Sequence, residues 1–300
     1  MNIIFASYAD SIEDLLNNYL LAKSIHEFAG NLSDIPLRIY VSSGLDIQNT
    51  IGKFEGLNVT FSKYPMVRKD IDYAFKSAAA RACEIDVKTG NVIWLDRHML
   101  VLNPCVNLLL DPLEQFAYRP PHLKLLGASA DEPLNQMWST AYQIAGVDVS
   151  ALFPIYTEVD RKKIWSYFSA GHFSFLADSG IMSEWDILFN QLVEHQAMRP
   201  FLDDETLTVD GETVRIFLHQ IALTLAVLRK LSRNALKPLP VFYGYPTHLH
   251  GDIEKHRQAS QMDQLHTAFY SCYDELPGMP ISKRLASWIE DKVKQFQHNG

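Results

Sequence analysis

Short apolar runs alternate with stretches of helical spacing over the first third of the chain. The segment Asn2–Ser7 contains three consecutive apolar residues and predicts a buried strand. Asp10 or Ser11 then supplies a helix N-cap, and two acidic residues follow in the first turn, where the helix dipole favours them. The next apolar positions recur every three or four residues and end before Gly30; they are Ile12, Leu15, Leu16, Tyr19, Leu20 and Ile25.

The alternation continues for another two strands, a helix and a strand. These elements are expected over Pro36–Ser42, Leu57–Ser62, Tyr73–Val87 and Asn91–Leu95. The resulting order, β-α-β-β-α-β, favours a parallel sheet with helices on both faces.

The second half of the chain is less regular. Its apolar runs predict strands over Phe116–Tyr118, Leu123–Ala128, His172–Leu176 and Pro238–Tyr243. Its helical spacings predict helices over Pro133–Ile144, Ser183–Gln196, Glu212–Leu231, Ala259–Tyr270 and Ser282–Gln297. No Gly/Ser-rich or Pro-rich linker and no internal repeat divides the sequence, so we expect one α/β domain with a strand-rich insertion after residue 96.

Composition narrows the class of protein. A hydrophobic fraction of 47% with 21% charged residues is ordinary for a globular domain, and the net charge of −8 argues against general nucleic-acid binding. The three cysteines are too few for a disulfide framework or a zinc cluster. The first residues carry no basic leader, and the longest apolar runs are too short to span a bilayer. We therefore expect a cytoplasmic protein, with peripheral membrane contact left open.

Ligands of parallel sheets bind where the strands end at their carboxyl side. Asp96 follows the strand expected over Asn91–Leu95, and Ala6, Ser7 and Tyr8 stand at the end of the first strand. In an extended segment, residues i and i+2 project to the same side, so Asp96 and His98 are expected to converge on one cation. The alternative is that Asp96 caps the turn after the strand and His98 is simply exposed.

The segment Val92–Pro104 resembles the signature of the GT-A glycosyltransferases, in which an apolar strand is followed by D-x-D, a short apolar strand and a proline. It is most similar to the glycogenin and bacterial galactosyltransferase-like group. The resemblance implies a Rossmann-like GT-A domain over residues 1–300, with a nucleotide-binding half over 1–104 and an acceptor and donor-sugar half over 105–300. It also implies a divalent metal bound to Asp96.

His98 stands where the family has its second acid. A neutral imidazole binds manganese better than magnesium and contributes no charge. Three interpretations remain open: the site prefers a softer ion such as Mn²⁺, its metal dependence is weakened, or activity has been lost.

Three further segments are similar to family motifs. In Tyr245–Gly251, His248 and Gly251 fit H-x-x-G, with His250 as a competing ligand. Lys255 follows one residue later than the family lysine that touches the diphosphate. The resemblance therefore implies Asp96, His98 and His248 as metal ligands.

In Tyr167–Phe173, Gly171 matches a turn that faces the donor sugar, although Ser169 replaces the family asparagine. In the segment beginning His219-Gln220, the histidine replaces the acid of D-Q-x-A-L, on a helix whose polar side faces the reaction centre. His219 and Gln220 are therefore candidate catalytic residues, the alternative being that this helix is chiefly a packing element.

Two basic segments complete the set of candidates. Lys76 lies on the helix that precedes the Asp96 strand, where the resemblance implies a basic residue that reaches the nucleotide. Arg68 and Lys69 follow the third strand, and we favour solvated charge for this pair.

The resemblance implies transfer of a sugar from a nucleotide-diphosphate donor, UDP-linked, to a glycan, lipid or protein acceptor. The first alternative is a non-catalytic relative that binds a nucleotide or another ligand, because His98, Ser169 and His219 all depart from the family pattern. Nucleotidyl transfer is a weaker alternative, because no Gly-rich basic loop follows the first strand.

Overall fold

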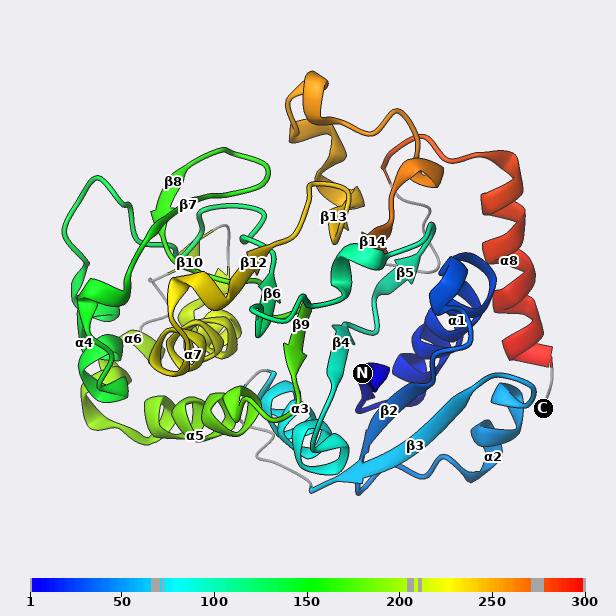
Figure 1. Ribbon diagram of the computed structural model, residues 1–300, viewed down its shortest axis with the longest axis horizontal. Helices are drawn as coiled ribbons and strands as arrows, with labels where there is room; N and C mark the ends of the chain where they lie inside the picture. Colours follow the sequence, from blue (N-terminus) through cyan, green and yellow to red (C-terminus); the bar gives the residue numbers. More distant parts are fainter. Residues whose placement is uncertain are drawn as a thin grey trace. The chain divides into compact units, whose positions relative to one another are not determined.

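The computed structural model describes residues 2–65, 71, 73–203, 208–209, 212–270 and 278–298. Within it the chain forms two compact units (Figure 1). Unit 1 comprises Met1–Met66, Gly90–Leu109 and Leu239–Gly300, and unit 2 comprises Val67–Thr89 and Leu110–Pro238. No helix among the described residues is long and apolar enough to cross a membrane.

Unit 1 is built on four parallel strands in the order β4-β1-β2-β3. Their bounds are Ile3–Ala9 (β1), Leu37–Ser42 (β2), Val59–Tyr64 (β3) and Asn91–Leu95 (β4). All of β4 is buried, and so is β1 after its first residue, as consecutive apolar positions require in a strand that is covered on both faces. The parallel strands predicted from the order of elements are confirmed.

Helix α1 (Ile12–Phe28) begins with a capping box. The Ser11 hydroxyl accepts from the backbone N–H of Asp14, and the Asp14 carboxylate accepts from the backbone N–H of Asp10 and of Ser11. Asn18 donates from its side chain to the carbonyl of Tyr8, which joins the helix to the carboxyl end of β1. The polar residues that predicted the start of the helix thus also fix the loop beside the first strand.

Two more helices belong to unit 1, α2 (Gln48–Ile51) and α8 (Lys283–His298). Helix α8 packs against α1, where the rings of Tyr19 and Phe296 lie 5.3 Å apart. The helix predicted over Ser282–Gln297 is therefore confirmed.

A second, small sheet of unit 1 corrects another prediction. It has the order β13-β14-β5, with bounds Tyr245–Pro246 (β13), Thr267–Phe269 (β14) and Met99–Val101 (β5). The helix expected over Ala259–Tyr270 is wrong, because this segment holds a 3-10 turn and then β14, which pairs antiparallel with β5. That partner lies far away in the sequence, so local periodicity did not reveal the pairing.

Unit 2 combines three strands with a layer of helices. Its strands β12 (Leu236–Pro238), β6 (Phe116–Tyr118) and β9 (His172–Leu176) lie in that order, with β6 parallel to β12 and antiparallel to β9. Two hairpins pair β7 (Pro154–Tyr156) with β8 (Lys163–Trp165) and β10 (Thr208–Val209) with β11 (Glu212–Thr213). The mixed strand directions agree with the α/β class expected from the sequence.

The strand expected over Leu123–Ala128 is wrong, because a tight turn occupies this segment, with the backbone N–H of Gly127 donating to the carbonyl of Lys124. The strand expected over Pro238–Tyr243 is also wrong. Strand β12 already ends at Pro238, since its pairing with β6 sets its limits.

The helices of unit 2 are α3 (Ala74–Val87), α4 (Gln136–Ala145), α5 (Ile181–Glu194), α6 (Arg199–Leu202) and α7 (Val214–Lys230). Helices α3, α4, α5 and α7 confirm the predicted helices, with small shifts at their ends, whereas α6 was not predicted. The Glu84 carboxylate on α3 accepts from the backbone N–H of Met182 and of Ser183, and so caps α5 in place of a local residue. Short 3-10 helices lie at Gly30–Leu32, Gly52–Phe54, Val106–Leu108, Val149–Ala151, Gln196–Met198, Arg233–Ala235, Thr247–Asp252, Lys255–Arg257 and Met262–Gln264.

Gly90 sets the start of β4, and its substitution should be costly. Its φ is +117°, and an added Cβ would lie 2.4 Å from the carbonyl oxygen of Asn2. We expect Gly90→Ala to lower the free energy of unfolding by about 3 kcal/mol or more, because the cost of the strained backbone and the cost of the steric clash add together.

Gly56→Ala is the matched control, since Gly56 has φ +78° with open space around it. Its loss should be about 1 kcal/mol, from the left-handed backbone alone. Urea denaturation of both variants measures the difference, and equal losses would contradict the steric account.

Candidate functional site

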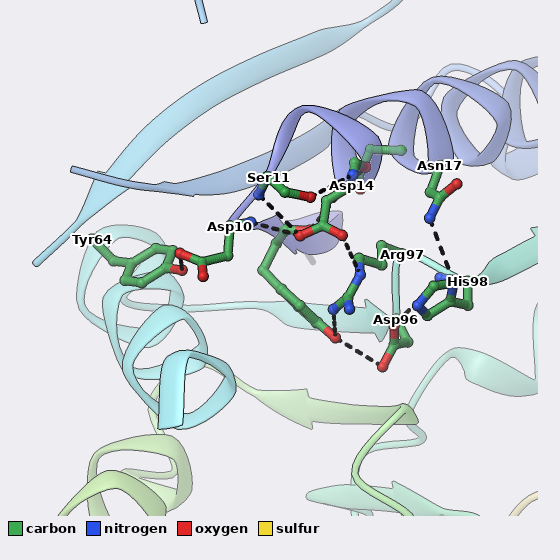
Figure 2. A network of polar contacts seen from close by, with 10 residues as sticks. Asp10, Ser11, Asp14, Asn17, Tyr64, Asp96, Arg97 and His98 are labelled. Atoms are coloured by element: carbon green, nitrogen blue, oxygen red, sulfur yellow. Dashed lines mark hydrogen bonds and ion pairs between the residues drawn. The ribbon is translucent and has the colours of Figure 1, made fainter. Parts of the chain in front are cut away.

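Asp96 lies directly after β4, at the carboxyl edge of the parallel sheet in unit 1. Its side chain is only 4% exposed. The Tyr8 hydroxyl donates to Asp96 Oδ2 at 3.0 Å, and the backbone N–H of His98 donates to Oδ1 at 3.3 Å (Figure 2). Both carboxylate oxygens thus have donors from the protein, as burial of a charged group requires.

Tyr8 is the centre of this arrangement. Its ring is fully buried, lies parallel to that of Trp94 at 6.0 Å, and has the Arg97 guanidinium 5.0 Å from its centroid. Burial is the main reason why the pKa of the Tyr8 hydroxyl is raised well above its ordinary value, and the charge of Asp96 raises it further. Tyr8 therefore stays protonated and acts as a donor to Asp96.

Arg97 joins this pair to the first turn of α1. Its Nη1 donates to the Tyr8 hydroxyl at 2.5 Å, and its Nε pairs with Asp14 Oδ1 at 2.5 Å. We call Tyr8, Asp14, Asp96 and Arg97 the carboxylate network; Figure 2 labels Asp14, Asp96 and Arg97. Two carboxylates and one guanidinium give this network a formal excess of one negative charge.

His98 and Asp96 direct their side chains differently. The His98 ring faces α1, with Nδ1 3.5 Å from Asn17 Nδ2, while the Asp96 carboxylate faces Tyr8 (Figure 2). The extended geometry assumed from the sequence is absent, because residues 96–98 form a turn closed by the backbone N–H of Met99 and the carbonyl of Asp96. In this turn, residues i and i+2 such as Asp96 and His98 do not project to the same side of the backbone.

His248 and His250 lie on the 3-10 helix Thr247–Asp252. His248 is exposed, and partial desolvation lowers its pKa. His250 Nδ1 lies 2.9 Å from the Tyr245 hydroxyl, which gives it a structural partner. Gly251 has open space where a side chain would be, and Lys255 is exposed on the next short helix.

One carboxylate and two imidazoles suit Mn²⁺ in kind. Among the described residues, however, no three His, Cys, Asp or Glu side chains are gathered as a metal site. The set Asp96, His98 and His248 therefore stays a prediction.

Ala6 and Ser7 lie inside β1 and are fully buried. The strand runs to Ala9, two residues beyond the expected end, so the first residues after it are Asp10 and Ser11. Unit 1 also has a hollow of about 490 Å³, lined by residues of β2, of β3 and of the segment 43–51 between them, including Asp46.

Tyr73 brings two predicted site residues of unit 2 together. Its ring lies 4.8 Å from that of His219, and the Lys76 ammonium lies 4.9 Å from its centroid. His219 Nδ1 lies 2.7 Å from the carbonyl of Ile216; since a carbonyl only accepts, Nδ1 carries the proton and Nε2 is the acceptor nitrogen of the neutral ring. The pair Arg68 and Lys69 lies outside the described residues.

The two family-like motifs of unit 2 meet at Thr224. Its hydroxyl accepts from the backbone N–H of Phe168 and donates to the carbonyl of Gln220. Phe168, which belongs to the same segment as Gly171, therefore contacts α7 one helical turn after Gln220. Ser169, which replaces the family asparagine, is 8% exposed, with its hydroxyl 3.5 Å from the backbone nitrogen of Gly171.

His172 follows in the same motif and is completely buried. Desolvation, with a further contribution from Arg119 and His122, lowers its pKa to about 3, so it is neutral near pH 7. A completely buried ring that is neutral near pH 7 contributes to packing rather than to proton transfer.

Sequence reasoning missed Arg97, Asp14 and Asn17 as parts of the site. Arg97 occupies the unspecified middle position of D-x-D, and Asp14 was interpreted only as an acid in the first helical turn. The spacing of three between Ser11 and Asp14, which is that of a capping box, is the sequence signal that could have placed Asp14 next to the end of β1.

Replacing Tyr8 by Phe tests the carboxylate network. We expect Tyr8→Phe to lower the free energy of unfolding by about 2 kcal/mol, because Asp96 loses a donor and Arg97 an acceptor. Tyr142→Phe is the control, since the Tyr142 hydroxyl is buried without a hydrogen-bond partner among the described residues. Urea denaturation measures both, and a loss in Tyr142→Phe as large as that in Tyr8→Phe would refute the role of the hydroxyl.

Comparison with known proteins identifies relatives of this arrangement. Residues 16–230 match the model of the Rhodobacterales glycosyltransferase domain. No curated protein matches the chain in sequence.

Among solved structures, the chain is similar to the apo form of the bifunctional glycosyltransferase WbbM, with a TM-score of 0.54, 11% identity, and coverage of 99% of this chain and 50% of WbbM. It is also similar to the glycosyltransferase GlyE of Streptococcus pneumoniae, with a TM-score of 0.50, 11% identity, and coverage of 98% and 61%. The galactosyltransferase LgtC, solved with donor and acceptor sugar analogues, gives a TM-score of 0.47 and 12% identity over 99% and 95%.

At these identities the structural likeness shows the fold alone, and the chain spans about half the length of WbbM. The family match is of a different kind, because it covers more than two thirds of the chain. The glycosyltransferase expected from Asp96-Arg97-His98 is thereby confirmed, and the chain belongs to the Rhodobacterales glycosyltransferase domain family.

Proposed function

We propose that this glycosyltransferase takes its sugar from a nucleoside diphosphate donor, UDP-linked, whose diphosphate binds beside Asp96. The observation that carries the proposal is the buried Asp96 carboxylate at the carboxyl edge of β4, next to the end of β1. Parallel sheets bind nucleotides at this edge. Membership of the family supports the transfer of a sugar but names neither donor nor acceptor.

The charge of the carboxylate network supports a cation as part of the bound donor. A diphosphate is an anion, and the network already has a formal excess of one negative charge. Asp96, His98 and His248 are the residues that would hold a divalent ion, which requires the His98 ring to leave Asn17; the two imidazoles favour Mn²⁺ over Mg²⁺. Such an ion supplies charge neutralisation on the leaving diphosphate.

The protein's own residues have positioning roles in this proposal. Tyr8 orients the Asp96 carboxylate, and Arg97 places positive charge at the same edge while holding the start of α1 through Asp14. Preorganised charge of this kind stabilises a transition state without reorganisation during the reaction.

In unit 2, the Gly171 backbone and the Gln220 side chain are proposed to line the donor sugar. Lys76 is proposed to lie near the nucleotide. His219 has the tautomer of a base, with Nε2 as acceptor, and is proposed to receive the proton of the acceptor hydroxyl.

A non-catalytic nucleotide-binding protein is the second candidate. It is favoured by one observation, that the described residues present no gathered metal ligands. Slow hydrolysis of the donor without acceptor separates the candidates, because a binding protein would protect the donor rather than cleave it.

UDP should stabilise this protein against heat more than AMP does. A ligand at one hundred times its Kd adds about 2.7 kcal/mol, which raises Tm by several degrees. Asp96→Asn should reduce the UDP shift, because its charge is lost at constant size. Asp34→Asn, at an exposed position of unit 1, should leave the shift unchanged. Equal shifts with UDP and AMP would refute the proposed donor class.

Manganese should increase the affinity for UDP by roughly tenfold, within the usual range of coupling between two ligands. Magnesium should do less, and His98→Asp should move the preference towards magnesium. Isothermal titration with EDTA as the metal-free reference measures this. His248→Gln should abolish the enhancement and His250→Gln should not, since His250 is bound by Tyr245. An unchanged UDP affinity in EDTA would remove the metal from the proposal and leave Arg97 as the cation.

A further inference from the structure

A second hollow lies wholly within unit 2. Its volume is about 470 Å³, within the range of sites that bind small ligands. The segment 124–137 forms most of its wall, and Phe201 of α6 and Val214 of α7 complete it.

The wall is a preformed turn. Leu125 has a φ of +37°, which is strained for a residue with a side chain, and the backbone N–H of Gly127 donates to the carbonyl of Lys124 at 2.5 Å. A Cβ at Gly127 would lie 2.8 Å from that carbonyl oxygen. The Trp138 indole N–H donates to the carbonyl of Leu126 at 2.7 Å and holds the turn from behind. Strain at a rigidly held turn is typical of a binding site.

The lining has two kinds of surface. Met137 and Val214 are buried apolar side chains, whereas Lys124 and Glu132 bring one cation and one anion to the same hollow, and Gln136 brings an amide beside that of Asn135. The formal charges of Lys124 and Glu132 cancel. A neutral ligand with an apolar face and several hydroxyl groups fits such a lining, because charged and amide groups hydrogen-bond hydroxyls while the C–H face packs on the apolar side chains.

The hollow shares its framework with both segments that are proposed to line the donor sugar. The Trp138 ring packs on Tyr167, with centroids 5.4 Å apart at 82°, and Tyr167 begins the segment that ends in the Gly171 turn. Val214 is the first residue of α7, which carries Gln220. A site connected to these two segments is suited to the second substrate of the same reaction.

We propose that this hollow binds a neutral sugar unit of the acceptor. The proposal rests on the proposed function, since it assigns the second substrate of that reaction. It makes the acceptor a glycan, and it makes Gln136 and Glu132 the residues that contact its hydroxyl groups.

The test uses lactose, maltose and chitobiose as neutral probes and glucuronic acid as a charged one. Saturation-transfer difference NMR on the full chain at ~10 mM probe detects affinities weaker than 1 mM. We expect at least one neutral disaccharide to bind and glucuronic acid to bind more weakly. The absence of saturation transfer from the protein to every neutral probe would overturn the proposal.

Gln136→Trp places a large side chain at an exposed lining position and should weaken binding of the neutral probe roughly tenfold or more. Gln143→Trp is the matched control on the same helix, exposed and outside the hollow, and should bind as the unmodified protein does. Unchanged binding in Gln136→Trp would overturn the location. The thermal shift with UDP should be the same in both variants; if UDP shifts neither these variants nor the unmodified chain, it is the proposed function that fails, whereas loss of sugar binding alone bears on the hollow.

Discussion

The hydrogen bond between the Tyr8 hydroxyl and the Asp96 carboxylate is the contact on which the candidate site depends. A carboxylate as buried as Asp96 is stable only when donors compensate its lost hydration. Tyr8 supplies one because its raised pKa keeps it protonated. Arg97 then connects the pair to Asp14, so that the ends of two central strands and the start of α1 share one polar network. Any ligand at this edge of the sheet meets a network that is already in place.

The turn at residues 96–98 decides how this chain departs from the family pattern. An acid at position 98 would offer charge for a second metal contact, whereas His98 lies against Asn17. Arg97, the middle residue of the motif, contacts Tyr8 and Asp14 and so brings positive charge into the carboxylate network. The site thus combines a carboxylate with a guanidinium, and two hydrogen bonds through the Tyr8 hydroxyl join them.

In unit 2, a single residue, Thr224, likewise joins two segments of the candidate site. Thr224 binds the backbone of Phe168 and of Gln220, so the strand-turn motif and the helix motif hold each other in position. Trp138 connects this framework to the wall of the hollow in unit 2 that we propose as the acceptor site. A substitution of Trp138 is therefore expected to disturb both the turn that lines the hollow and the segment that contains Gly171. Variants at exposed lining positions avoid this double effect.

The sequence by itself determined the parallel strands of unit 1, the capped helix α1, the long helix α7 and the position of Asp96, because each follows from local periodicity, capping residues or a strand end. Only the tertiary structure decided that residues 259–270 contain a strand, since β14 exists through pairing with β5. It also decided the direction of the His98 side chain, because a turn replaced the extended segment that i, i+2 spacing assumes. The roles of Arg97 and Asn17 became visible only in three dimensions, since Arg97 pairs with Asp14 and Asn17 contacts His98, each partner lying about eighty residues away in sequence.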